Sequence, residues 1–169
     1  MYKSMEFKSN ILMDQGQKLI FENIREYFFT KISIMNYWLV KSEPSTYSWD
    51  DFTELGRDHW DGVRNYQARN NLMAMKALDR VLFYHSVKGK EVVGIAEVVR
   101  EHYPDPTTDD KRWVVVDLEP VEKLPKPVTL EQIKADERLT EIALIKQSRL
   151  SVLPLKKEEY DIILGLAYD

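Results

Sequence analysis

The 169-residue sequence contains no cysteine, which excludes disulfides, thiol catalysis and zinc–thiolate sites and favours a reducing, cytoplasmic location. Only six glycines are present, and none are spaced to form a phosphate-binding loop. No run of about 18 apolar residues predicts a membrane span. Glu6, Asp14 and Glu22 interrupt any apolar stretch that would indicate a secretory signal. We therefore expect a cytoplasmic protein that does not bind membranes.

The chain also has no excess of positive charge, since it contains 24 basic and 28 acidic residues and its formal net charge is −4. A protein that coats long nucleic acid needs many lysines and arginines on one face, so the balance disfavours that class. It still permits a protein that reads a single nucleotide in a pocket with a local basic rim.

Motifs of catalysis and metal binding are absent as well. The three histidines, His59, His85 and His102, lack metal-ligand spacing, and no nucleophile or metalloprotease motif occurs. The adjacent pairs Asp50-Asp51 and Asp109-Asp110 could act as catalytic dyads, but neighbouring carboxylates usually point apart. A helix start and a solvated loop suit these pairs better. We expect neither an enzyme nor a bound metal or cofactor.

Hydrophobic residues make up 44% of the chain, enough for the core of one domain. Residues 1–34 differ from the rest, and apolar residues at helical spacing predict an amphipathic helix over about 17–31. This segment is interpreted as an N-terminal extension, or alternatively as a helix that packs on the domain or pairs subunits. The domain itself is assigned to residues 35–169.

Patterning within 35–169 predicts an α+β fold with a small, mostly antiparallel sheet or barrel, because strands and helices do not alternate regularly. Capping boxes at Ser48/Asp51 and Thr129/Gln132 mark two helix starts. Pro120, Pro125 and Pro127 predict a rigid connector between elements. The expected strands are 37–40, 80–85, 91–100, 112–118 and 151–153, and the expected helices are 48–55, 66–78, 129–135, 137–146 and 156–167.

The segment Trp60–Asn70 mixes aromatic, amide and arginine side chains in a loop that opens a helix. Aromatic rings can stack on a base at about 1–3 kcal/mol per base, and free N–H groups at a helix start suit an anionic ligand. A buried tryptophan that anchors a loop, with arginines on the surface, is the alternative interpretation.

Three further segments could contribute to the same site. Alternation along residues 81–86 places Tyr84 and Ser86 on one face of a strand and His85 on the other, which suits either a pocket wall or a core strand. Residues 41–44 and 146–152 supply charges and hydroxyls near strand ends, or else surface turns. The candidate ligand-binding residues are Lys41, Ser42, Glu43, Trp60, Val63, Arg64, Asn65, Tyr66, Arg69, Tyr84, His85, Ser86, Arg149 and Ser151.

Six collinear blocks resemble the EVE domain family of the PUA-like superfamily. They are Tyr-Trp-Leu-Val-Lys-Ser-Glu-Pro at 37–44, Trp-Asp-Gly-Val-Arg-Asn-Tyr-Gln-Ala-Arg-Asn at 60–70, Phe-Tyr-His-Ser at 83–86, Val-Gly-Ile-Ala-Glu-Val at 93–98, Trp-Val-Val-Val-Asp-Leu at 113–118 and Gln-Ser-Arg-Leu-Ser-Val at 147–152. The sequence departs from the family at Leu78-Asp79, where a Gly-Asp turn often precedes the strand.

The resemblance implies a PUA-like β-barrel flanked by helices, related to the YTH and ASCH domains. It implies a nucleic-acid-binding module that reads a modified base, methylated or hydroxymethylated cytosine, flipped into an aromatic pocket, with DNA favoured over RNA. In this interpretation Trp60 stacks on the base with Tyr84 as a second wall, and Ser42 and Asn65 read its edge. Lys41, Arg64, Arg69 and Arg149 would offset phosphate charge.

Two alternatives remain open. A PUA-like domain could read modified tRNA or rRNA, and the same cleft could hold a small molecule or nucleotide or act as an enzyme.

Overall fold

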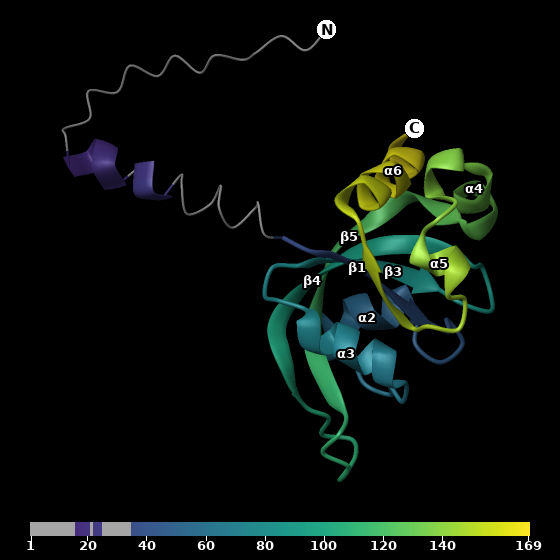
Figure 1. The fold of residues 1–169 in the computed structure, drawn as a ribbon, viewed down its shortest axis with the longest axis horizontal. Helices are drawn as coiled ribbons and strands as arrows, with labels where there is room; N and C mark the ends of the chain where they lie inside the picture. The colour runs from purple at the N-terminus through teal and green to yellow at the C-terminus, as the bar shows by residue number, and fades with distance from the viewer. Residues whose placement is uncertain (1–15, 21, 25–34) are drawn as a thin grey trace, which may run out of the picture. The chain divides into compact units, whose positions relative to one another are not determined.

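A computed structural model describes residues 16–20, 22–24 and 35–169 of the chain (Figure 1). The chain divides into two units, Met1–Ile34 and Met35–Asp169. Residues 16–20 and 22–24 are helical, in agreement with the first part of the helix predicted over 17–31. Residue 21 and residues 25–31 of that prediction lie outside the described residues.

The second unit is built on a six-stranded sheet with the order β2-β5-β4-β3-β1-β6. Its strands are β1 (Tyr37–Ser42), β2 (Asp58–His59), β3 (Arg80–His85), β4 (Glu91–Pro104), β5 (Val114–Thr129) and β6 (Val152–Leu155). β1 pairs with β3 in parallel and every other ladder of the sheet is antiparallel. The expected mostly antiparallel α+β fold is confirmed. The ladder runs from β2 to β6 without pairing these two edge strands, so the described sheet is not closed.

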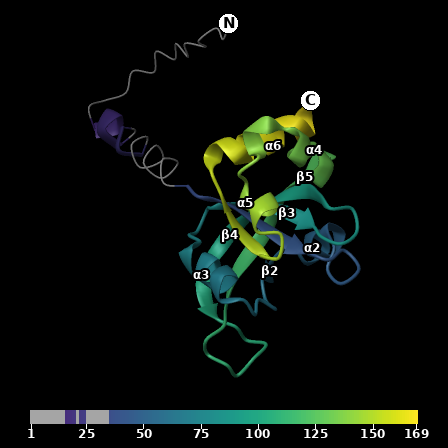
Figure 2. The same ribbon diagram turned by 45° about the vertical axis from the view of Figure 1, so that its right-hand side comes forward.

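Helices accompany the sheet, with α4 and α6 side by side in both views (Figures 1 and 2). They are α2 (Trp49–Leu55), α3 (Tyr66–Ala74), α4 (Leu130–Ala135), the 3-10 turn η1 (Glu137–Leu139), α5 (Ala143–Lys146) and α6 (Lys157–Tyr168). Both predicted capping boxes are present, at Ser48 for α2 and at Thr129 for α4. Asn65 caps α3 through its side chain. Local sequence therefore fixes where these three helices begin.

The connector predicted at Pro120, Pro125 and Pro127 is wrong, because β5 runs through all three prolines. Proline removes a backbone N–H from a ladder and is tolerated at irregular pairing. The register of the β4–β5 ladder shifts at several points. One shift lies between the pair Gly94–Lys123 and the pair Val92–Val128. Pro125 and Pro127 fall in this interval, so the strand continues past them.

The helix predicted over 66–78 ends early, since α3 stops at Ala74 and Met75 is extended. Leu72 and Met75 are buried as expected, but Leu78 is 38% exposed. Leu78 has a φ of 76°, a left-handed conformation that glycine adopts without strain. The helix predicted over 137–146 is likewise interrupted, with η1 and α5 separated by residues 140–142.

The residue after Leu78 organises the start of the sheet. The carboxylate of Asp79 is 2% exposed and accepts hydrogen bonds from the backbone and side chain of Asn36, from Trp38 Nε1 at 2.8 Å and from Lys76 N at 2.9 Å. These bonds satisfy the buried side-chain oxygens of Asp79 and tie β1 to the turn before β3.

Phe83 of β3 is the centre of the aromatic core. Its ring centroid lies 5.3 Å from Trp49, 5.5 Å from Phe52 and 5.5 Å from Trp60. Trp49 covers Gly94 of β4 so closely that a Cβ at this position would lie 2.5 Å from its ring atoms Cζ2 and Cζ3. This packing holds Trp60 against the sheet with one side toward a cavity.

Candidate nucleic-acid interface

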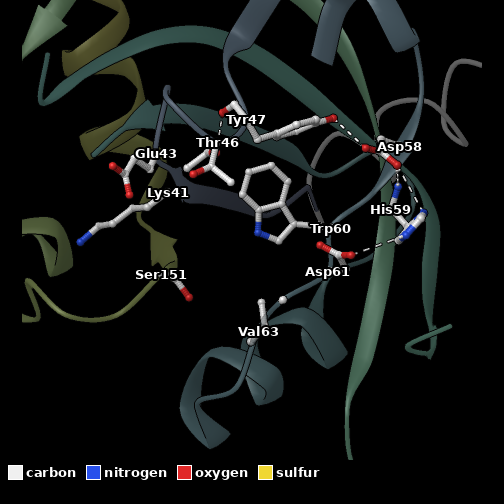
Figure 3. Close-up of a pocket in the computed structure, with 12 residues that line it drawn as sticks. Lys41, Glu43, Thr46, Tyr47, Asp58, His59, Trp60, Asp61, Val63 and Ser151 are labelled. Atoms are coloured by element: carbon white, nitrogen blue, oxygen red, sulfur yellow. Dashed lines mark hydrogen bonds and ion pairs between the residues drawn. The ribbon is translucent and has the colours of Figure 1, made fainter. Parts of the chain in front are cut away.

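A cavity of about 510 Å³ opens where β1 ends, beside the loop that carries Trp60 (Figure 3). Its size falls within the range of small-molecule and cofactor sites. Its walls come from the end of β1 and the following turn, from β2 and the loop after it, and from the residue before β6. The lining residues are Lys41, Ser42, Glu43, Thr46, Tyr47, Asp58, His59, Trp60, Asp61, Gly62, Val63 and Ser151.

Trp60 lies between the two polar walls of this cavity (Figure 3). Its side chain packs edge-on against Phe83 and against Tyr47, at interplanar angles of 88° and 68°, and the residue is 8% exposed. Its backbone N–H donates to Val116 O of β5 at 2.8 Å. Trp60 thus belongs to the core and also lines the cavity, which agrees with a buried tryptophan that anchors the loop, while base stacking stays a prediction.

One wall is a chain of polar groups. Tyr47 donates its hydroxyl to Asp58 Oδ2 at 2.8 Å, and His59 lies between two carboxylates, with Nδ1 3.3 Å from Asp58 and Nε2 3.8 Å from Asp61. Burial and the hydrogen bond to Asp58 raise the pKa of Tyr47 far above its usual range. Tyr47 therefore keeps its proton and acts as a donor to Asp58.

The opposite wall combines a cation with hydroxyl groups. Lys41 Nζ donates to Ser148 O at 2.9 Å, and burial lowers the pKa of this lysine. Ser42 donates its hydroxyl to Tyr47 O at 2.6 Å. Lys41 N donates to Ser151 O at 2.9 Å, which places the Ser151 side chain beside the end of β1. With Glu43 here and Asp58 and Asp61 opposite, the cavity has three carboxylates against one lysine.

A second, more open cavity of about 340 Å³ lies beside the first. Asn65 and Gln67 at the start of α3 line it together with Lys146, Gln147, Ser148, Arg149 and Leu150. The cavities share a border, because Lys41 of the first contacts Ser148 of the second and Leu150 of the second precedes Ser151 of the first. Two predicted residues, Asn65 and Arg149, meet here.

Six of the 14 predicted residues line the first cavity, namely Lys41, Ser42, Glu43, Trp60, Val63 and Ser151. Arg64, Tyr66 and Arg69 line neither cavity. Arg64 Nη1 donates to Asp105 Oδ2 at 2.8 Å, and Asp105 is 3% exposed. This contact neutralises the guanidinium that the sequence suggested for phosphate binding.

Tyr66 and Arg69 form a separate surface group with Trp113 and Arg112. The Tyr66 ring lies 5.3 Å from Trp113, and its hydroxyl accepts from Arg112 Nη1 at 3.1 Å. Arg69 lies over the Tyr66 ring at 5.0 Å and donates to the side chain of Asn70.

Tyr84, His85 and Ser86 also lie outside both cavities. Burial raises the pKa of Tyr84 to about 12. His85 Nε2 accepts from Trp49 N at 3.1 Å, and burial lowers the pKa of this histidine. Ser86 donates its hydroxyl to Ser42 O at 3.1 Å. In the structure Tyr84 does not form a second cavity wall beside Trp60, and Tyr47 occupies that position.

Six lining residues are not among the candidate ligand-binding residues named from the sequence: Thr46, Tyr47, Asp58, His59, Asp61 and Gly62. Asp61 and Gly62 belong to the block at 60–70, so their proximity to Trp60 was a usable signal. Asp58 and His59 directly precede Trp60, so proximity in sequence pointed to them as well, and the pairing of β2 with β5, which their sequence does not reveal, fixes their place in the wall.

The EVE domain model matches residues 36–166, most of the chain. The chain belongs to the EVE domain family. Mouse thymocyte nuclear protein 1 is 37% identical over 168 residues, covering 79% of this chain and 74% of the mouse protein. The EVE resemblance inferred from the six sequence blocks is confirmed.

Solved structures of EVE relatives share the fold. A protein from Rhodopseudomonas palustris is 47% identical with a TM-score of 0.76, covering 79% of this chain and 94% of that one. A crystal structure of human THYN1 protein in complex with 5-methylcytosine-containing DNA is 32% identical with a TM-score of 0.74, covering 79% of this chain and 98% of that one. Among the described residues, no helix has the length and apolar character needed to cross a membrane.

Proposed function

We propose that this EVE domain binds DNA and holds a modified cytosine, flipped out of the duplex, in the cavity beside Trp60. The observation that carries the proposal is this cavity, which places an aromatic ring between two hydrogen-bonding walls. It occurs in a chain 32% identical to human THYN1 protein, which has been solved with 5-methylcytosine-containing DNA. Unstacking a base costs a few kcal/mol, and stacking on an aromatic ring returns about 1–3 kcal/mol.

The polar groups of the cavity suit cytosine better than thymine. Cytosine presents an amino group at N4, which a carboxylate can accept, whereas thymine presents the acceptor O4. Glu43 and Asp61 are exposed carboxylates on opposite walls. The contact of Asp61 with His59 Nε2 is long, at 3.8 Å, so Asp61 can also accept a hydrogen bond from a base. Lys41 uses one donor on Ser148 and retains two N–H groups for a base carbonyl oxygen. A thymine would bring its O4 toward carboxylate oxygens.

Recognition of the methyl group needs shape in addition to apolar contact. Burying one methyl contributes about 0.8 kcal/mol, which corresponds to only about a fourfold preference. Val63, 5% exposed, and the Trp60 ring are the apolar surfaces of the cavity that could contact a C5 substituent. A larger preference would require that the cavity enclose this substituent.

We further propose that residues 35–169 form the binding unit without residues 1–34, and that the twisted sheet is an open form of the PUA-like barrel. Within the described residues no group of three or more histidine, cysteine, aspartate or glutamate side chains could hold a metal ion. We propose the role of a reader that binds the base through hydrogen bonds and stacking.

The test is a binding panel on the full chain. Matched DNA and RNA oligonucleotides would carry cytosine, 5-methylcytosine, 5-hydroxymethylcytosine or thymine at one position, and fluorescence anisotropy would report affinity. We expect modified cytosine in DNA to bind most tightly. Preference for the RNA set would identify an RNA reader, and tight binding of free nucleotides with no oligonucleotide preference would identify a small-molecule binder.

A further inference from the structure

The second cavity has the donor-rich lining of an anion site. Asn65 Oδ1 accepts from Ala68 N, and Gln147 Oε1 accepts from Gln67 Nε2 at 2.6 Å. In these contacts the side-chain oxygens of Asn65 and Gln147 act as acceptors. Their NH₂ groups therefore remain available as donors to a ligand. No carboxylate lines this cavity, in contrast to the three in the first cavity.

Arg149 supplies the charge of the second cavity. It is exposed, and in the part of the chain that the structure describes it makes no ion pair or side-chain hydrogen bond. Other cations are already engaged: Lys146 of the same cavity contacts Glu141 at 2.8 Å, Lys41 Nζ donates to Ser148 O at 2.9 Å, and Arg64 contacts Asp105. Arg149 is thus a cation beside the base cavity whose charge no carboxylate offsets.

We propose that the second cavity binds a phosphodiester group of the strand that carries the flipped base, with Arg149 as its principal ligand. This inference rests on the proposed function. Because Lys41 of the first cavity contacts Ser148 of the second, we place the backbone of a nucleotide whose base lies beside Trp60 at the border of the two cavities. Guanidinium groups bind phosphate oxygens through paired hydrogen bonds, and the amides of Asn65 and Gln147 add neutral donors.

The division of charge explains how an acidic domain can bind DNA. Removing the five basic and four acidic residues of 1–34 leaves 19 basic and 24 acidic residues in 35–169. Phosphate placed in the first cavity would face Glu43, Asp58 and Asp61, whereas phosphate in the second cavity would face no carboxylate. The strand is therefore expected to enter along the side of the molecule where α3 begins and the 146–150 segment lies.

The test compares the wild-type chain with Arg149→Gln and with a matched control, Lys126→Gln. Lys126 is an exposed residue of β5 outside both cavities, and its replacement changes the net charge equally. Arg149→Gln should weaken binding of a 5-methylcytosine oligonucleotide about tenfold, the loss of one charge-assisted hydrogen bond. The slope of log affinity against log salt should become shallower by about 0.9 for duplex DNA or 0.7 for a single strand. Lys126→Gln should change neither quantity.

Two further measurements assign the phosphate. Methylphosphonate substitution at one phosphate beside the modified base should weaken wild-type binding but should add nothing in Arg149→Gln, because both changes remove the same contact. Binding of free 5-methylcytidine, followed by NMR chemical shifts, should be the same in both proteins.

The outcomes separate this inference from the proposed function. A wild-type chain that binds no oligonucleotide overturns both. A wild-type chain that prefers modified cytosine while Arg149→Gln keeps its affinity and salt slope overturns only the phosphate site. Equal losses of nucleoside and oligonucleotide binding in Arg149→Gln would place Arg149 in base recognition and would also overturn it.

Discussion

Replacement of Trp60 can separate the proposed stacking on a base from core packing, because this side chain packs in the core and also lines the cavity. Its edge-on contacts with Phe83 and Tyr47 and its 8% exposure predict that Trp60→Ala lowers the free energy of unfolding by about 3–5 kcal/mol, as for other core aromatic residues. Globular domains have a total stability of about 5–15 kcal/mol, so the alanine variant would leave little margin. Trp60→Phe keeps an aromatic ring against Phe83 and is the more informative change.

The effect on binding follows from the stacked area. Loss of an aromatic platform costs about 1–3 kcal/mol per base, or about 5- to 150-fold in affinity for Trp60→Ala. Trp60→Phe retains part of that face, and we expect a loss at the lower end of this range. Binding would be measured by anisotropy with a 5-methylcytosine oligonucleotide, and stability by urea unfolding of the same preparations.

Trp113→Phe is the matched control, since Trp113 is 9% exposed and lines neither cavity. It should lose stability without losing affinity. The stacking role is refuted if Trp60→Phe is folded and binds as tightly as the wild type. It is also refuted if both phenylalanine variants lose affinity only in proportion to their unfolded fraction.

Three further predictions concern the fold around the site. Gly94→Ala should lower the free energy of unfolding by about 1–3 kcal/mol because its Cβ overlaps the Trp49 ring, and adding Trp49→Phe should restore part of the loss in a double-mutant cycle. Leu78→Gly should unfold at a higher urea midpoint than Leu78→Ala, because both lose the leucine side chain but only glycine adopts the positive φ without strain, a difference of about 0.5–1 kcal/mol after the entropic cost of glycine. Burial lowers the pKa of His85 in the folded state below the ordinary value of 6.5 that it has in the unfolded chain. Between these two pKa values the unfolded chain therefore binds more protons than the folded one. Stability should therefore fall as the pH drops through 6.5, and His85→Gln should remove this component of a stability-against-pH curve.

The fold was predictable wherever a local signal fixed an element. Ser48 and Thr129 mark two helix starts through capping boxes that involve only neighbouring residues. Local proline chemistry misled at β5, because the irregular pairing with β4 that admits Pro125 and Pro127 depends on a distant strand. The unusual conformation of Leu78 was foreshadowed by its departure from the Gly-Asp turn of the family.

The sequence predicted several residues of the candidate site but not which side chains contact one another there. The block around Trp60 contains the aromatic centre of the cavity, and its neighbours Val63 and Asp61 follow from proximity in sequence. The sequence could not show that Tyr47 meets Asp58, or that Arg64 is neutralised by Asp105, 41 residues away. The sequence alone does not show which lysines and arginines are free to bind phosphate, because that depends on carboxylates contributed by distant segments of the chain.

The arrangement of charge suggests that affinity and base selectivity have separate origins in this domain. Carboxylates beside Trp60 can discriminate an amino group from a carbonyl oxygen, but they repel phosphate and cannot contribute attraction to the backbone. In the proposed arrangement Arg149, which lines the adjoining cavity, would attract any strand and would touch no base edge. Because the two groups line adjoining cavities, only a nucleotide that is flipped and still joined to its strand satisfies both. A free base would gain the first set of contacts alone, and an unflipped duplex the second alone.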